Sequence, residues 1–140
     1  MKLRFLKFSV AMAFCFFFLT GANAQILKLR STSLATNEIR ENGSWKGWTD
    51  LNDSNLLITI DTEIQRIVIY ANETQKFDIT EYAGQKIDED GDDVFTFYCV
   101  DNDGRTCKID VLTLHSQNGK RQLYIYYSDI AFLFNVYLLD

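Results

Sequence analysis

The sequence predicts an all-β protein, and three observations support that class. Segments rich in Val, Ile, Thr, Tyr and Phe alternate with short clusters of Asn, Asp, Gly and Ser, which is the pattern of strands separated by turns. The connections are too short for parallel crossovers, which need about a dozen residues or more. The chain has no proline, and its seven glycines fall mostly where turns are expected. Together these features predict an antiparallel up-and-down meander of about eight strands.

The expected strands follow one another with polar turns between them. The first strand, at 26–39, ends before an Asn-Gly turn at 41–44, a dipeptide that readily takes positive φ. A short second strand at 45–49 and a loop at 50–54 come next, and a longer acidic loop is expected at 83–93. For the last segment, a helix across 130–139 is the alternative. The other expected strands are 56–60, 66–71, 75–82, 94–100, 106–114, 122–127 and 130–138.

Such a meander forms either a small barrel or a two-layer sandwich. Closure removes exposed sheet edges and therefore favours the barrel. Alternation along each strand places Phe97 and Ile125 on the inner face and Tyr124 and Tyr126 on the outer face. The segment 130–138 is apolar on both faces, so it must be covered on both sides or present an apolar surface.

The first 24 residues have the three parts of a secretory signal peptide. Lys2, Arg4 and Lys7 form a basic start, 8–19 is almost wholly apolar, and Ala22 and Ala24 supply a small-x-small exit. The apolar run is shorter than the roughly 20 residues that span a bilayer. We therefore expect a signal peptide at 1–24 and a single β domain at 25–140, exported to the periplasm or the medium without a transmembrane anchor.

The charge balance limits the classes of partner that the protein can bind. The full chain has 14 basic and 19 acidic residues, and removing the signal peptide takes away three basic ones. The remaining 116 residues then carry eleven basic and 19 acidic side chains, a net charge of −8. Phosphate binding requires a basic surface, so nucleic acid is excluded as a partner.

Two cysteines remain after the signal peptide, and both fall in one expected hairpin. A turn centred near Asp103 puts Cys99 and Cys107 opposite one another on the same face. In an oxidising compartment this placement predicts a structural disulfide, although the expected separation of their Cβ atoms is slightly long for one. Two buried free thiols are the alternative, followed by a redox or metal role.

The titratable residues do not form a recognisable catalytic or metal-binding pattern. The acidic loop with Asp88, Asp90 and Asp92 does not match the helix-loop-helix calcium spacing. The single histidine, His115, lies near a strand end, and Asp110 has the opposite face parity. We therefore expect no enzymatic activity, no cofactor and no metal site.

The aromatic residues are the better candidates for a function. Trp45 and Trp48 flank a turn, and Tyr124 and Tyr126 share an outer face with Tyr98 on a neighbouring strand. Tryptophans near a loop can stack on a sugar or anchor a partner. They can equally close one end of a barrel, and the tyrosines can simply stabilise the sheet through cross-strand contacts.

Several stretches occur in an order that resembles a group of short secreted proteins from Bacteroidetes-type Gram-negative bacteria. They are LLITID with RIVIY, ETQKFDI, the run from DGD through FYCVDNDG to the second cysteine of the hairpin, and LYIYYSD with NVY. The resemblance covers most of the chain after the signal peptide. That group has no established activity, so the resemblance implies a bacterial exported protein and transfers no site residue.

The sequence thus predicts an exported, non-enzymatic interaction or structural module that contacts another protein or a cell-surface component. The alternative is a small lipocalin-like barrel that binds an apolar ligand in its interior. A third hypothesis is an extracellular hydrolase or inhibitor. Bulky inward side chains distinguish the first two, because they predict a packed interior without room for a lipid.

Overall fold

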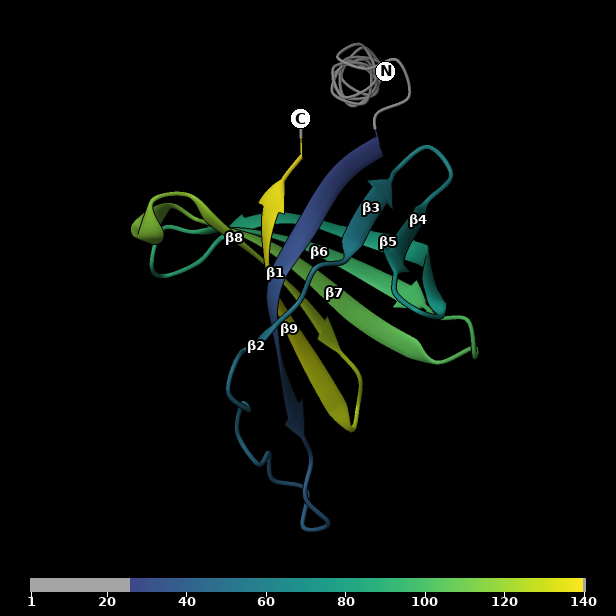
Figure 1. Ribbon diagram of the computed structural model, residues 1–140, viewed down its shortest axis with the longest axis vertical. Helices are drawn as coiled ribbons and strands as arrows, with labels where there is room; N and C mark the ends of the chain where they lie inside the picture. Colours follow the sequence, from purple (N-terminus) through teal and green to yellow (C-terminus); the bar gives the residue numbers. More distant parts are fainter. Residues whose placement is uncertain (1–25, 140) are drawn as a thin grey trace, which may run out of the picture.

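The computed structural model describes residues 26–139, and most of them lie in antiparallel strands (Figure 1). One short 3-10 turn, η1, interrupts the series of strands. The elements are β1 (Ile26–Glu38), β2 (Asn52–Asp53), β3 (Leu57–Asp61), β4 (Arg66–Tyr70), β5 (Thr74–Ile87), β6 (Asp93–Val100), β7 (Thr106–Leu114), η1 (His115–Gln117), β8 (Lys120–Tyr126) and β9 (Ile130–Leu138).

Eight of the strands close into a barrel. From β3 to β9 each strand pairs with the next one along the chain, and β1 completes the ring by pairing with β3 on one side and β9 on the other. The two-residue β2 adds to the edge of β1 beyond β3. The predicted up-and-down meander is confirmed, the barrel is formed rather than the sandwich, and the last segment is a strand rather than a helix.

Side chains fill the interior of the barrel. Alternating positions on neighbouring strands supply aliphatic and aromatic groups, as on β8, where Leu123 and Ile125 are 0% and 3% exposed. Across from them lie Ile109 on β7 and Phe134 on β9, both buried. An eight-stranded barrel has an interior just wide enough for side chains to occupy, and here they do so.

The prediction of a second strand at 45–49 is wrong. Residues 45–49 make only an isolated bridge, between Trp45 and Ile39, while the strand beside β1 is Asn52–Asp53, inside the expected loop. The segment 45–49 is nevertheless hydrogen-bonded to β1, because Lys46 N donates to Glu38 O at 2.9 Å. It lies along the end of β1 without forming a regular ladder.

The expected loop at 83–93 is also shorter than predicted. Strand β5 continues to Ile87 through two register shifts, one between Ile79 and Glu81 and one between Tyr82 and Gly84. Each shift reverses which residues face inward, so the alternation that signals a strand is lost after Tyr82. Gly84, at φ 97°, adopts a backbone conformation that favours glycine.

The two cysteines lie directly opposite each other on β6 and β7, as predicted, but they are free thiols and not the predicted disulfide. Asp101 N donates to Arg105 O at 2.9 Å across the hairpin turn, so that pair is a hydrogen-bonded one. Hydrogen-bonded and non-hydrogen-bonded pairs alternate along an antiparallel ladder, which makes Cys99 and Cys107 a hydrogen-bonded pair too. The Cβ atoms are farther apart in such pairs, which explains two separate sulfurs.

The expected signal peptide at 1–24 lies outside the described residues. Within residues 26–139, none of the helical structure has the length and apolar character needed to cross a membrane.

Candidate functional site

A groove of about 610 Å³ lies on the outer surface of the barrel wall. Its walls include side chains that alternate with core residues along the same strands, such as Tyr124 and Tyr126 on β8 and Asp110 on β7. The volume is therefore separate from the packed interior. The groove is lined by Asn37, Trp45, Trp48, Lys86, Asp88, Val94, Asp110, Leu112, Tyr124, Tyr126 and Ala131.

The segment between β1 and β2 forms one wall of the groove. In Figure 1 this segment projects from one end of the barrel, beyond the tip of β1. Two contacts hold its two tryptophans in place: Gly47 N donates to Asn37 Oδ1 at 2.9 Å, and Thr49 N donates to Thr36 O at 2.8 Å. Gly47 has φ 100°, so glycine suits the bend between Trp45 and Trp48.

Four aromatic side chains line the groove. Trp48 meets Tyr124 edge to face, with ring centroids 5.8 Å apart and planes at 70°. Tyr124 and Tyr126 lie parallel, at 5.6 Å and 2°. Such pairs add about 0.5–1.5 kcal/mol beyond their buried area. Trp45 and Trp48 remain 42% and 41% exposed, so both indole rings are available to a ligand.

A small residue lies among these large rings. Ala131 on β9 is only 3% exposed although its position faces outward, and it lines the groove with Tyr126 and the tryptophans. Its neighbours in the register are Tyr126 on one side and Asn37 on the other. Because the side chain of Ala131 is only a methyl group, it leaves open the volume that the groove occupies. The low exposure of Ala131 also shows that part of the outer face of β9 is covered, as the sequence predicted.

Charged groups lie beside the aromatic rings. Asp110, whose side chain is 14% exposed, accepts a 2.7 Å hydrogen bond from Thr96 Oγ1 and forms a 3.8 Å ion pair with Lys108. The Lys108 ammonium lies 4.9 Å from the centre of the Tyr126 ring, a cation–π contact. Lys86 and Asp88 line the groove from β5 and the turn that follows it.

Both tyrosine hydroxyl groups of the groove keep their protons at neutral pH. Burial, with a smaller contribution from the Asp110 carboxylate, raises the pKa of Tyr126 to about 12. Burial also raises the pKa of Tyr124, whose hydroxyl group donates to Gln122 Oε1 at 3.1 Å. The rings therefore present neutral phenols to a ligand.

The structure brings together four of the five aromatic residues that the sequence singled out. Trp45, Trp48, Tyr124 and Tyr126 all line the groove. Tyr98 is 42% exposed but lies outside the groove, two strands from Tyr126 with Lys108 between them in the register. The polar groove residues Asn37, Lys86 and Asp88 were not predicted, because no local pattern places Asn37 on β1, or Lys86 and Asp88 at the end of β5, beside the aromatic rings.

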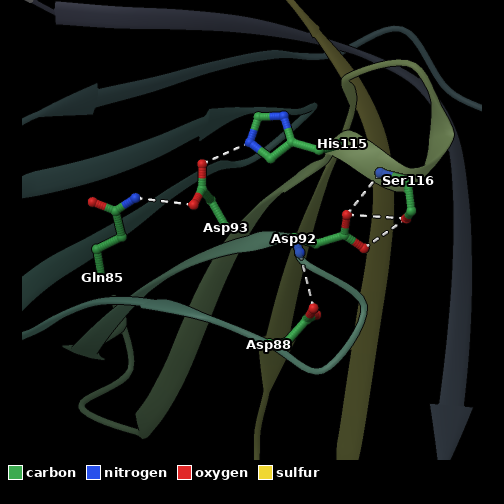
Figure 2. Close-up of polar contacts among 6 residues, drawn as sticks. All are labelled: Gln85, Asp88, Asp92, Asp93, His115 and Ser116. Carbon is green, nitrogen blue, oxygen red and sulfur yellow. Dashed lines mark hydrogen bonds and ion pairs between the residues drawn. The ribbon is translucent and has the colours of Figure 1, made fainter.

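The single histidine has a carboxylate partner that the sequence analysis missed. His115 Nε2 lies 2.8 Å from Asp93 Oδ2, and Gln85 Nε2 donates to the other oxygen of Asp93 at 3.1 Å (Figure 2). The hydrogen bond with His115 is the main reason that the pKa of Asp93 is lowered. The β6–β7 register, with Asp93 opposite Thr113, brings the two residues within reach.

The neighbouring serine belongs to a different contact. The Ser116 hydroxyl group donates to Asp92, at 2.9 and 3.0 Å from its two oxygens, and Ser116 N donates to the same carboxylate at 3.0 Å (Figure 2). Because this hydroxyl group is directed to Asp92, the contacts of Ser116, His115 and Asp93 do not follow the serine–histidine–aspartate order of a catalytic triad.

The acidic turn between β5 and β6 is closed by its own carboxylates. Asp88 Oδ1 accepts hydrogen bonds from the backbone N of Asp90 and of Asp92, both at 3.0 Å. Carboxylate oxygens of the three residues lie within 4.8 Å of one another. These contacts make the segment a hydrogen-bonded turn, and Asp88 also lines the groove.

Comparison with protein-family models, curated proteins and solved structures found no match for this chain.

Proposed function

We propose that this protein is a non-enzymatic binding module that acts outside the cytoplasm after export and holds its partner in the outer groove. The observation that carries the proposal is the clustering of Trp45, Trp48, Tyr124 and Tyr126 around one groove on the barrel wall. Concave sites lined by aromatic rings with a few polar groups are typical of ligand-binding sites, and about 610 Å³ lies within their usual size range. Tryptophan and tyrosine also dominate binding energy at interfaces.

The connection that carries the tryptophans supports the same conclusion. It runs from residue 39 to residue 51, whereas every other connection between strands has five residues or fewer. Long connections in compact domains are commonly functional. This one is also held to the end of β1 by backbone hydrogen bonds. A loop fixed before binding loses less conformational entropy when the partner arrives.

Packing inside the barrel favours an external site over an internal one. The alternative function, an apolar ligand held in a lipocalin-like cavity, needs interior volume that side chains such as Phe97, Leu123 and Phe134 occupy. The groove has both charged and aromatic walls, which also suits a surface partner better than a buried lipid.

The proposal is tested by photo-crosslinking in the source organism. A benzophenone amino acid replaces Trp45 in one variant and Tyr70 in a control variant. Tyr70, on β4, is 48% exposed and does not line the groove. Ultraviolet irradiation is expected to give a discrete adduct of higher mass from the Trp45 position and none from the Tyr70 position.

Two results would contradict the proposal. One is equal crosslinking from both positions, which would mean nonspecific contact over the whole surface. The other is the absence of an adduct at Trp45 together with an apolar ligand extracted from the purified protein, which would place binding inside the barrel.

A further inference from the structure

The residues at the groove indicate which chemical class of partner it can bind, and this inference rests on the proposed binding function. Four charged side chains lie at the groove or against its rings: Lys86, Asp88, Lys108 and Asp110. Two are positive and two are negative, and carboxylate oxygens of Asp90 and Asp92 lie within 4.8 Å of one of Asp88. A strongly anionic ligand would meet these carboxylates, and a strongly cationic one would meet two ammonium groups. An uncharged ligand avoids both conflicts.

A cationic ligand is disfavoured for a second reason. Aromatic rings attract cations through their negative faces, and one such position here is already taken. The ammonium group of Lys108 lies 4.9 Å from the centre of the Tyr126 ring and is held there by Asp110, 3.8 Å away. A ligand ammonium group would have to displace this internal one.

The groove combines aromatic ring faces with polar groups, and this combination further limits the kind of ligand that it can bind. Trp45 and Trp48 offer partly exposed indole rings, which demand an apolar surface from the ligand. The same groove carries the carboxylates of Asp88 and Asp110, which already accept hydrogen bonds from the Asp90 and Asp92 backbone and from Thr96 but have lone pairs left for donors on a ligand. A purely apolar ligand would use only the rings, whereas a purely polar one would gain nothing from them.

A sugar ring satisfies both requirements, because its C–H bonds form an apolar face while its hydroxyl groups point outward around the rim. We propose that the groove binds an uncharged oligosaccharide, with a sugar face stacked on the tryptophan wall and hydroxyl groups donating to Asp88 and Asp110. The residues that line the groove come from β7 and β8, from the 45–48 segment and from the Asp88 turn, among others.

The test uses the intrinsic fluorescence of the protein. The chain has only two tryptophans, and both line the groove, so their emission reports on this site alone. Purified protein is titrated with uncharged hexasaccharides of glucose, mannose, xylose and N-acetylglucosamine, with hexagalacturonate and a chitosan hexamer as anionic and cationic counterparts, and with a glycine-serine peptide and a tetralysine peptide. Calorimetry provides an independent measure of each affinity.

At least one uncharged hexasaccharide is expected to bind saturably, and both charged sugars and both peptides are expected to bind at least tenfold more weakly. Trp48→Ala is expected to weaken the binding about tenfold, as loss of a stacking ring commonly does. The control Tyr70→Ala changes an exposed aromatic residue outside the groove and is expected to leave the affinity within twofold. Thermal unfolding of each variant confirms that it is folded.

The inference is overturned if none of the uncharged sugars binds, if a charged sugar or a peptide binds best, or if Trp48→Ala binds as the wild type does. These outcomes are distinguishable from failure of the proposed function. A groove crosslink to a protein, combined with no sugar binding, would retain a binding module and reject the oligosaccharide.

Discussion

Replacing Leu123 by alanine tests whether the barrel interior is packed, on which the choice of an external site depends. The Leu123 side chain is 0% exposed and lies between Val111 on β7 and Phe134 on β9, both of which belong to the core. Deleting a buried leucine removes its transfer free energy and leaves a cavity, at a total cost of about 3–5 kcal/mol. The hydrogen-bonded strands on both sides prevent the site from collapsing, so we expect a cost of about 4 kcal/mol.

Equilibrium unfolding in urea measures this cost as a shift in the midpoint at constant slope. The matched control is Leu51→Ala, because Leu51 is 54% exposed, and its cost should stay within about 0.5 kcal/mol. Benzene provides a second readout. A new dry cavity binds small apolar molecules, so benzene should raise the unfolding temperature of Leu123→Ala and leave that of the wild type unchanged.

A cost of less than about 1 kcal/mol for Leu123→Ala, or stabilisation of the wild type by benzene, would contradict a packed interior. Either result would mean that the interior has spare volume, and the lipocalin-like alternative would then be preferred over a site on the outer wall.

Three further predictions follow from the polar contacts and the thiols. Replacing His115 by alanine should raise the pKa of Asp93 in a carboxyl NMR titration, and an unchanged pKa would contradict the contact. Because the contact lowers the pKa of Asp93, it stabilises the folded protein above the ordinary carboxylate pKa. This stabilisation is lost as the pH falls through the lowered pKa of Asp93. Asp92→Ala should cost about 1–3 kcal/mol in urea unfolding, because Asp92 is 3% exposed and accepts hydrogen bonds from both the hydroxyl group and the backbone N of Ser116, while Asp92→Asn should cost less. Iodoacetamide should leave Cys99 and Cys107 unmodified in the folded protein, since both side chains are buried; both should react after unfolding, and a disulfide-linked peptide would overturn the assignment of free thiols.

The fold could be predicted from the sequence because its information is local. Strand periodicity, turn residues and short connections together specify an antiparallel meander, and the hairpin around Asp103 specifies that Cys99 faces Cys107. What the residue pattern did not provide was the ladder position of that pair. Hydrogen-bonded and non-hydrogen-bonded pairs look alike in sequence, and the difference emerges only when the turn bond from Asp101 N to Arg105 O is known. The expected disulfide failed for that reason.

The candidate site was only partly predictable, because it is assembled from distant segments. Alternation correctly placed Tyr124 and Tyr126 outside, and the doubly apolar last strand indicated that its outer face needed cover. No local pattern shows that the segment carrying Trp48 lies along the end of β1 and reaches Tyr124. Lys86 was missed because the register shifts in β5 disrupt the alternation that would have placed it on the outer face.

The same alternation would separate the residues that stabilise the barrel from those of the proposed binding site. On β8, Leu123 faces a packed core, while its neighbour Tyr124 faces the groove. Substitutions at inward positions act on the free energy of unfolding, since they change buried volume on a rigid scaffold. Substitutions at outward positions that are partly solvated, such as Tyr124, Trp45 and Trp48, should affect the proposed bound state more than the free energy of unfolding. A site on the outside of a filled barrel can therefore change its ligand without disturbing the core, whereas a site inside would have to give up core volume for every atom of ligand it admits.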